Sequence, residues 1–210
     1  MIGTKKDLDI LAHKDHARLL IISDSHGNYA VMEKIVKQFG KSCDALIFCG
    51  DGAADIAQLL YSADIDHSVK KTLPSVSAFV QGNGDPSSYP VSPLKSIKVP
   101  VREILTVNEQ NFMIVHGHRQ GVDFGFDMLW FEMQEENCKT AFYGHTHIAN
   151  EYQKGSYRFI NPGSCSRPRG GQPPCCAIAT VEKTFVDTAF LRMDRGENGE
   201  TIFNLWNPTY

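Results

Sequence analysis

RLLIISDSHGN, residues 18–28, joins a compact apolar run to a group of polar side chains, and it decides how the rest of the chain is interpreted. The contiguous Leu and Ile residues of 18–23 predict a strand buried on both faces, as strands of parallel sheets are. Asp24, Ser25 and His26 follow that strand directly. The stretch therefore predicts a buried strand that ends in side chains able to bind a ligand.

Strands and helices alternate through the first half of the chain. Asn28 is expected to cap a helix that stops at Gly40. Further strands are predicted at 44–49 and 76–81, with a helix over 53–62 between them. Strand–helix–strand alternation predicts an α/β fold with parallel strands.

The second half predicts antiparallel hairpins and one more helix. The predicted helix covers 123–137, and a short strand covers 140–143. The predicted hairpins and last strand are 101–107 with 111–116 around the turn 108–110, 148–153 with 156–160, 176–182 with 185–192, and 200–206.

Composition indicates one globular domain of ordinary size. The chain has 210 residues, 42% hydrophobic and 21% charged, with a net charge of −3. We expect an N-terminal extension over 1–17 and a single domain over 18–210. The negative charge gives no reason to expect a nucleic acid duplex or an anionic membrane as partner. A homo-oligomer remains open.

The N-terminus and the cysteines indicate a cytoplasmic protein. The first 17 residues are charged throughout and lack the apolar centre of a signal peptide, and no apolar run approaches the roughly 20 residues of a membrane span. Six cysteines show no zinc-ribbon pairing, so we expect reduced thiols that serve as small hydrophobes.

Polar side chains follow five of the predicted strands. A Gly-Asp or Asn-Gly pair after one strand usually marks a turn. Five such turns together are better explained by a ligand site, because ligands bind at the C-terminal strand ends of open α/β sheets. The side chains in question are Asp24, His26, Asp51, Asn83, His116, His145 and His147.

This ligand set indicates a metal centre. Carboxylate and amide oxygens mixed with imidazole nitrogens suit manganese, iron, zinc or nickel. Seven ligands are too many for one tetrahedral ion and suit two ions that share a bridging aspartate. Two metals about 3.5–4 Å apart are a recurring device for hydrolysing phosphate esters. A small phosphorylated substrate is therefore expected, with Mn²⁺ as the expected metal and Fe²⁺, Zn²⁺ or Ni²⁺ as alternatives.

The motifs DSH, GD, GNGD, HGH and GHTH, in this order, resemble those of the calcineurin-like metallophosphoesterases, and in particular the small bacterial and archaeal phosphodiesterases. The segment Asn161-Pro162-Gly163-Ser164 also resembles one that these proteins carry. The resemblance runs from about residue 18 to residue 192. It implies a four-layer α-β-β-α sandwich of two mixed sheets flanked by helices.

The resemblance also implies a role for each ligand. Asp24, His26 and His147 would bind the first metal, and Asn83, His116 and His145 the second. Asp51 would bridge the two ions, and a hydroxide between the ions would attack phosphorus in line. Asp51, Asn83 and His118 are the residues expected to take part in catalysis.

Four positions near these motifs leave alternatives open. Much of the superfamily has a histidine where this chain has Gly84, so general-acid catalysis lacks its usual residue here. His118 could contact a phosphate oxygen or support His116 from behind. Arg167 and Arg169 could meet an anionic substrate, although arginines in a Gly/Pro loop are usually just solvated.

Two other classes of function compete with a phosphodiesterase. Some relatives use the same fold as a non-catalytic platform that binds a protein partner, but those have eroded motifs, whereas all seven ligand positions are filled here. A metal-dependent hydrolase of another bond, such as an amide, usually has paired histidines on the first strand, and this strand ends in Asp24-Ser25-His26.

Overall fold

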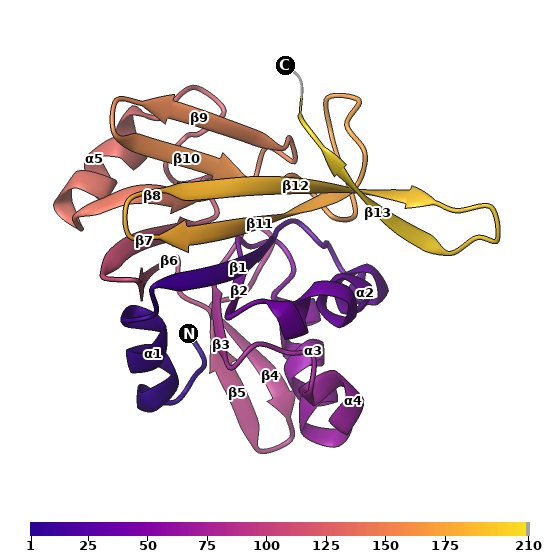
Figure 1. Ribbon diagram of the computed structural model, residues 1–210. Helices are drawn as coiled ribbons and strands as arrows, with labels where there is room; N and C mark the ends of the chain where they lie inside the picture. Colours follow the sequence, from indigo (N-terminus) through magenta and orange to yellow (C-terminus); the bar gives the residue numbers. More distant parts are fainter. Residues whose placement is uncertain (209–210) are drawn as a thin grey trace.

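Two mixed β-sheets lie face to face with helices on their outer faces in the computed structural model, which describes residues 1–208 (Figure 1). The first sheet has the strand order β13-β12-β11-β1-β2-β3, with bounds β1 His16–Ile22, β2 Ala45–Phe48, β3 Val76–Phe79, β11 Cys175–Glu182, β12 Val186–Arg195 and β13 Thr201–Trp206. The second has the order β6-β7-β8-β10-β9, with bounds β6 Arg102–Val107, β7 Gln110–Val115, β8 Cys138–Phe142, β9 Asn150–Lys154 and β10 Tyr157–Asn161. This confirms the predicted α/β sandwich.

The helices and a small hairpin complete the chain. Their bounds are α1 Lys5–Ala12, α2 Tyr29–Phe39, the 3₁₀ turn η1 Gly40–Ser42, α3 Ala53–Ile65, α4 His67–Lys70, α5 Asp127–Glu135, β4 Ser88–Ser92 and β5 Lys95–Lys98. Within residues 1–208, no helix combines the length and the apolar character needed to cross a membrane.

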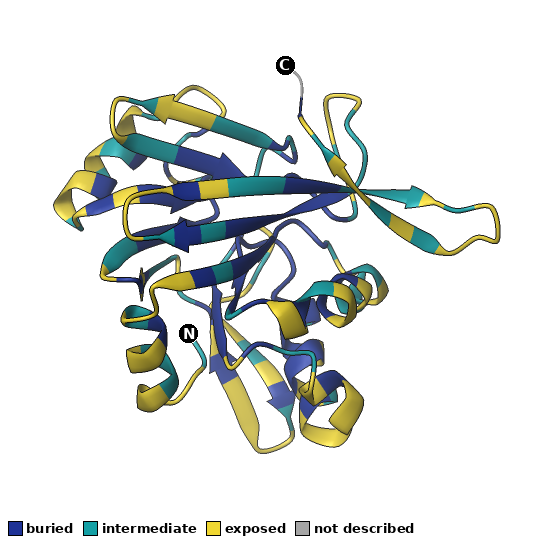
Figure 2. Cartoon of the chain, viewed as in Figure 1, coloured by how far each residue is buried: buried dark blue, intermediate teal, exposed yellow. Residues whose placement is uncertain are grey.

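Three apolar clusters separate the four layers. The first lies between the sheets and includes Leu19 and Ile47 of one sheet and Phe112 of the other. The second lies between the first sheet and helices α2 and α3, and the third between the second sheet and α5. Burial in Figure 2 follows the same layers, because the helices are exposed only on their outward sides. Alternate residues of the central strand β1 therefore face different clusters, so that this strand is buried on both faces.

Parallel pairing places polar strand ends side by side. β1, β2 and β3 are parallel neighbours in the first sheet, and β7 and β8 are parallel neighbours in the second. The sequence argument placed all five polar strand ends at the edge of one sheet, which is wrong. The hairpin β6–β7 begins a second sheet, because its apolar face packs onto the first sheet instead of extending it.

Glycines and turns set several element bounds differently from the prediction. The helix predicted over 123–137 begins only at Asp127, because Gly125 has φ +140°, which no α-helix accommodates. The turn predicted over 108–110 is shorter. Asn108 and Glu109 both have left-handed φ, as a two-residue hairpin turn requires, and Gln110 already pairs with Val107.

The predicted extension, residues 1–17, lies against the rest of the fold. Thr4 and Asp7 form a capping box at the start of α1, a signal that was visible in the sequence and missed. Leu11 of α1 is buried in the first cluster, and Ile2 forms an antiparallel bridge with Ser77. The boundary at residue 18 stays a prediction, and the last two residues of the predicted domain lie outside the described part of the chain.

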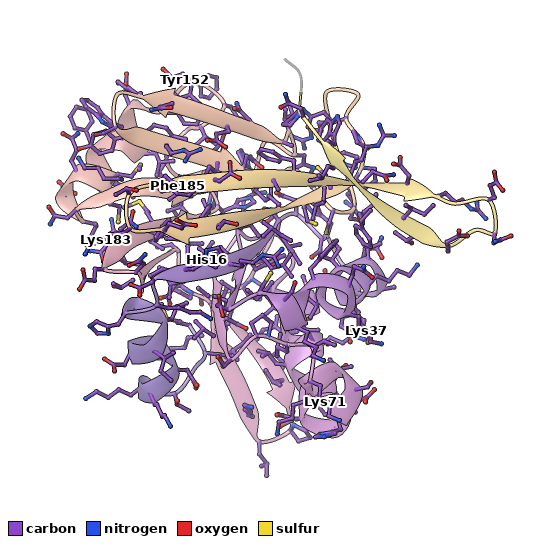
Figure 3. All side chains as sticks on the ribbon, in the orientation of Figure 1. His16, Lys37, Lys71, Tyr152, Lys183 and Phe185 are labelled. Atoms are coloured by element: carbon purple, nitrogen blue, oxygen red, sulfur yellow. The ribbon has the colours of Figure 1, made fainter. Side chains whose placement is uncertain are left out.

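The strands after α5 and the cysteines follow the predicted pattern, whereas the hairpin β4–β5 was not predicted. The turn between β11 and β12 carries Lys183 and Phe185 beside the start of β1, where His16 pairs with Glu182 (Figure 3). All six cysteines are buried and free, and burial raises the pKa of the Cys138 thiol to about 11. They pack as small apolar side chains, as expected.

Candidate metal centre

The structure brings all seven predicted ligand residues together where strands of both sheets end. β1 leads to Asp24 and His26, β2 to Asp51, β3 to Asn83, β7 to His116, and β8 to His145 and His147. Strand ends from two sheets therefore converge on one centre.

A first group of four side chains forms a compact cluster. The ligand atoms of Asp24, His26, Asp51 and His147 all lie within 4.8 Å of one another. His147 Nε2 lies 3.2 Å from Asp24 Oδ1 and 3.0 Å from His26 Nε2. Asp24 and Asp51 are buried, so their charges are poorly hydrated. A cluster of this composition can hold a divalent cation.

A second group lies on the other side of Asp51. Asn83 Oδ1 lies 3.2 Å from His116 Nε2 and 3.1 Å from His145 Nδ1. Asp51 Oδ2 lies 3.6 Å from His116 Nε2 and 3.8 Å from His26 Nε2. The Asp51 carboxylate thus stands between the two groups, which is the position a bridging ligand needs.

Hydrogen bonds to backbone carbonyls fix the tautomers of two histidines. His147 Nδ1 lies 2.6 Å from the carbonyl oxygen of Arg167, and His116 Nδ1 lies 2.7 Å from that of Cys49. Because a carbonyl oxygen only accepts, each Nδ1 carries the proton. In this tautomer the Nε2 atom of each ring faces the centre, as in metal-binding histidines.

Ligand atoms without a hydrogen-bond donor indicate whether a cation fits the centre. Asp24 Oδ1 is buried without a hydrogen-bond donor, while Oδ2 accepts from Ser23 Oγ at 2.6 Å. Burial lowers the pKa of His147, but the hydrogen bond and charge of Asp24 outweigh burial and raise it. Burial lowers the pKa of His26, which favours its neutral ring. When His147 is neutral, its Nε2 lone pair and Asp24 Oδ1 converge with no donor between them, an arrangement that a divalent cation stabilises.

Backbone strain is concentrated at the same residues. Eight non-glycine residues in the described part of the chain have positive φ, and five of them are predicted ligands: Asp24, His26, Asp51, His145 and His147. Left-handed φ costs a non-glycine residue about 1–3 kcal/mol and persists where the surroundings impose it. Such strain is typical of functional sites, and no sequence pattern predicted it.

Two aspartates that the sequence analysis missed hold the ligand loops. Asp55 of α3 is buried and accepts from Ser25 Oγ and from the Gly27 N–H, within the loop that carries His26. The Asp85 carboxylate accepts from the N–H groups of Gly52, Ala53 and Gly82 at 2.8–3.2 Å. Asp85 thereby ties the loop after β2 to the loop after β3.

The Asn161–Ser164 segment, which begins at the end of β10 in the second sheet, holds the ligand loops in place. Asn161 Nδ2 donates to the Gly144 carbonyl, and Ser164 Oγ donates to the Asp24 carbonyl at 2.8 Å. Both side chains are fully buried. The sequence analysis noted this segment only as a resemblance, and its contacts show that it joins the loops of Asp24 and of the two histidines after β8.

Three residues near the ligand motifs have contacts of their own. His118 lies beside the second group, its ring centroid 5.3 Å from that of His116, and its Nδ1 is buried without a partner. Asn28 is at the N-cap of α2, but its side chain makes no capping bond, so that prediction is wrong for the side chain. Its amide donates weakly to Ser166 Oγ at 3.4 Å instead. Asp123, which was not predicted, lies 2.8 Å from His145 Nε2.

Replacing Asp85 by alanine should destabilise the fold by about 1.5–3 kcal/mol, because three backbone N–H groups lose an ionised acceptor. Affinity for a divalent metal should fall about 10–100-fold, since the loops of Asp51 and Asn83 lose their connection. Urea unfolding and manganese titration measure the two effects. Asp64→Ala, which removes an exposed pair with Lys95, is the matched control and should change neither by more than about 0.5 kcal/mol. Equal behaviour of the two variants would contradict the role given to Asp85.

The chain belongs to the calcineurin-like phosphoesterase superfamily, whose domain model matches residues 18–184. It is 27% identical over 172 residues to the probable metallophosphoesterase YsnB of Bacillus subtilis, covering 82% of this chain and 89% of YsnB. It is 29% identical over 162 residues to the phosphodiesterase YfcE of Escherichia coli K12, covering 74% and 83%. The structure of Vacuolar Protein Sorting 29 from Cryptosporidium parvum shares the fold, with a TM-score of 0.64, 16% identity and coverage of 92% and 98%.

Proposed function

We propose that this chain is a metal-dependent phosphodiesterase that binds two divalent ions and hydrolyses a small phosphate ester. The observation that carries the proposal is the convergence of seven oxygen- and nitrogen-bearing side chains, with Asp24 Oδ1 buried and lacking a donor. Membership of a phosphoesterase superfamily and similarity to a protein named phosphodiesterase support the same reaction class. Mn²⁺ as the native metal and a cytoplasmic location belong to the proposal.

Each ligand has a stated place in the proposed centre. Asp24, His26 and His147 hold the first ion, and Asn83, His116 and His145 hold the second. Asp51 is shared between them, because one of its oxygens lies within 3.8 Å of a histidine nitrogen of each group. When bound, such ions lower the pKa of a coordinated water and neutralise charge on phosphate oxygens.

The protein's own residues supply orientation and charge balance. The Cys49 and Arg167 carbonyls accept from Nδ1 of His116 and His147, which directs Nε2 of each ring toward the centre. Asn83 contributes a neutral oxygen, so two carboxylates face two divalent ions and the centre stays net positive. An anionic phosphate ester is attracted to such a centre, and a neutral ester or amide is not. His118 is placed to contact a bound phosphate or to support His116.

A protein-binding platform of the same fold is the alternative, since a vacuolar sorting protein shares the architecture. The two functions differ in what the purified chain does with bis(p-nitrophenyl) phosphate. A phosphodiesterase releases nitrophenolate in the presence of manganese and stops when the metal is chelated. Metal binding without hydrolysis of any diester in a panel would favour the platform.

Elemental analysis after manganese reconstitution should give two ions per chain. His145→Ala should lower this to about one, because the second group loses a ligand while the four-residue first cluster is intact. His67→Ala, on α4 and outside the centre, is the matched control and should keep two. One ion or none in the parent protein at saturating manganese would refute the two-metal centre.

A further inference from the structure

A pocket of about 390 Å³ opens directly beside the proposed metal centre. His26 and Asp51 form part of its wall, so a molecule in the pocket touches the same side chains that face the metals. Its volume lies within the roughly 300–1,000 Å³ of small-molecule sites. A larger groove of about 760 Å³ runs along β12 and β13 but is lined by none of the seven ligand residues. The smaller pocket is therefore the one positioned to receive the rest of a substrate.

Glycines keep the pocket open. Gly27 and Gly84 both line it. A Cβ built on Gly27 would meet no atom within 4 Å, and one on Gly84 would meet Asp51 Oδ1 at 3.4 Å. Position 84, where much of the superfamily has histidine, has no side chain here, so no side chain fills the space next to Asp51. A larger side chain there would occupy the volume that a substrate group can use.

The hairpin β4–β5 supplies an apolar wall. Tyr89 of β4 and Pro86 before it line the pocket, and Tyr89 packs in part against the core cluster beside α3. A tyrosine ring anchored in this way is a rigid planar surface, which favours offset stacking with another planar ring. The sequence analysis did not predict this hairpin, and it therefore did not predict a binding site for the organic part of a substrate.

Arg167 supplies the positive charge. It lines the pocket, and no ion pair to an acidic side chain engages it among residues 1–208. Its backbone is fixed to the centre, because its N–H donates to Ser164 Oγ at 2.7 Å and its carbonyl accepts from His147 Nδ1. An arginine whose backbone is held in this way, with its guanidinium free, suits a phosphate oxygen.

We propose that this pocket selects phosphate esters that carry a planar aromatic or heterocyclic group. The ring lies against Tyr89 and Pro86 in the space left by Gly84, and Arg167 binds a phosphate oxygen. The inference rests on the proposed phosphodiesterase function and adds the substrate class to it. Arg167 is assigned to substrate positioning. Its Gly/Pro surroundings alone would favour a solvated loop residue without a role.

Calorimetric titration of the manganese-loaded protein with phenyl phosphate and with methyl phosphate tests the inference without any turnover. Phenyl phosphate should bind about 10-fold more tightly, from ring stacking and buried apolar area. Tyr89→Ala should bring the ratio of the two affinities close to one, whereas Tyr89→Phe, which keeps the ring, should preserve it. Thermal unfolding of each variant shows that the fold is retained.

Arginine variants test the anionic half of the pocket. Arg167→Ala should weaken both ligands about 5- to 10-fold and leave their ratio unchanged, because it acts on the phosphate that they share. Arg169→Ala removes the same charge from the same loop but not from the pocket lining, and should weaken both ligands less than Arg167→Ala does. Equal effects of the two arginine variants would overturn the assignment of Arg167.

Hydrolysis of diesters is measured in a separate experiment, so that failure of the phosphodiesterase proposal can be distinguished from failure of the pocket proposal. Selective binding of phenyl phosphate without hydrolysis of any diester would overturn the phosphodiesterase and support the pocket. Hydrolysis together with equal affinities for phenyl and methyl phosphate in the parent protein would overturn the pocket and support the phosphodiesterase. Absence of binding by either phosphate to the manganese-loaded protein would also overturn the pocket.

Discussion

Asp51→Asn should lower kcat/KM for a diester substrate by more than 100-fold, beyond the 10–100-fold that loss of a supporting contact typically causes. Asp51 is the carboxylate that lies between the two groups of ligands, with Oδ2 within 3.8 Å of His26 Nε2 and 3.6 Å of His116 Nε2. Its Oδ1 accepts the Gly84 N–H at 2.8 Å. The substitution therefore removes a charge from a position that both proposed ions share.

The orientation of the introduced amide makes the loss larger. Its single oxygen would be retained by the Gly84 N–H, so the amide NH₂ would replace Oδ2 of the native carboxylate and point toward the histidine nitrogens. A donor group cannot bind a cation, and both ions would lose a ligand at once.

Steady-state kinetics at saturating manganese, with metal content measured on the same samples, check this expectation. His147→Ala removes a terminal ligand of one ion only and should reduce kcat/KM less. Asp64→Asn, which makes the same change on an exposed carboxylate, should leave it unchanged. Retention of activity within 100-fold by Asp51→Asn would show that Asp51 is not the shared ligand.

The rate should depend steeply on the leaving group. With glycine at position 84, no side chain of that motif can protonate the departing oxygen. General acid assistance is worth about 10²–10⁴-fold, and most for poor leaving groups. Across a series of methyl aryl phosphate diesters, log kcat should therefore fall steeply as the pKa of the leaving phenol rises.

Gly84→His should flatten that dependence by raising kcat for the poorest leaving groups. The structure accommodates the change, because a Cβ at position 84 would meet Asp51 Oδ1 at 3.4 Å and Gly84 is not among the residues with positive φ. Gly84→Ala adds the same Cβ without an imidazole and should keep the steep slope. Rates are compared as kcat at saturating substrate, so that weaker binding of the aryl group in a filled pocket does not confound the result.

A shallow slope in the parent protein, with chemistry shown to be rate-limiting, would mean that an acid acts from elsewhere. His118 would then be the first residue to replace, because its ring lies beside those of His116 and His145. Burial lowers the pKa of His118, which makes it a poor proton donor near neutral pH. This favours the steep slope.

Local sequence determined the elements and the chemistry of the ligands. Runs such as 18–23 predict buried strands because contiguous apolar side chains need an apolar environment on both faces. Asp24, Asp51 and His116 each follow such a run closely, so the chain order alone placed them at strand ends. The four-layer architecture came from the resemblance, since periodicity gives elements but does not say which sheet a strand joins.

Weak local signals account for most of what was missed. The Thr4–Asp7 capping box marks α1 but lies in a segment with few apolar residues. The hairpin of Ser88–Ser92 and Lys95–Lys98 has little periodic apolar character, because it covers α3 with only some of its side chains. Asp85 was included only as part of a turn, since nothing local shows that its carboxylate reaches the N–H groups of another loop.

Tertiary structure alone decided how the ligands meet. His147 Nε2 approaches Asp24 Oδ1 although the two residues are far apart in the chain, and that contact exists because two separate sheets present their strand ends to each other. The left-handed backbone at Asp24, His26 and Asp51 is likewise set by the surrounding structure, because aspartate and histidine tolerate this conformation better than most residues but do not require it. The sequence by itself determined which atoms could bind a metal. Packing of the two sheets determined that these atoms face one another, and left beside them a pocket that both Tyr89 and Arg167 line.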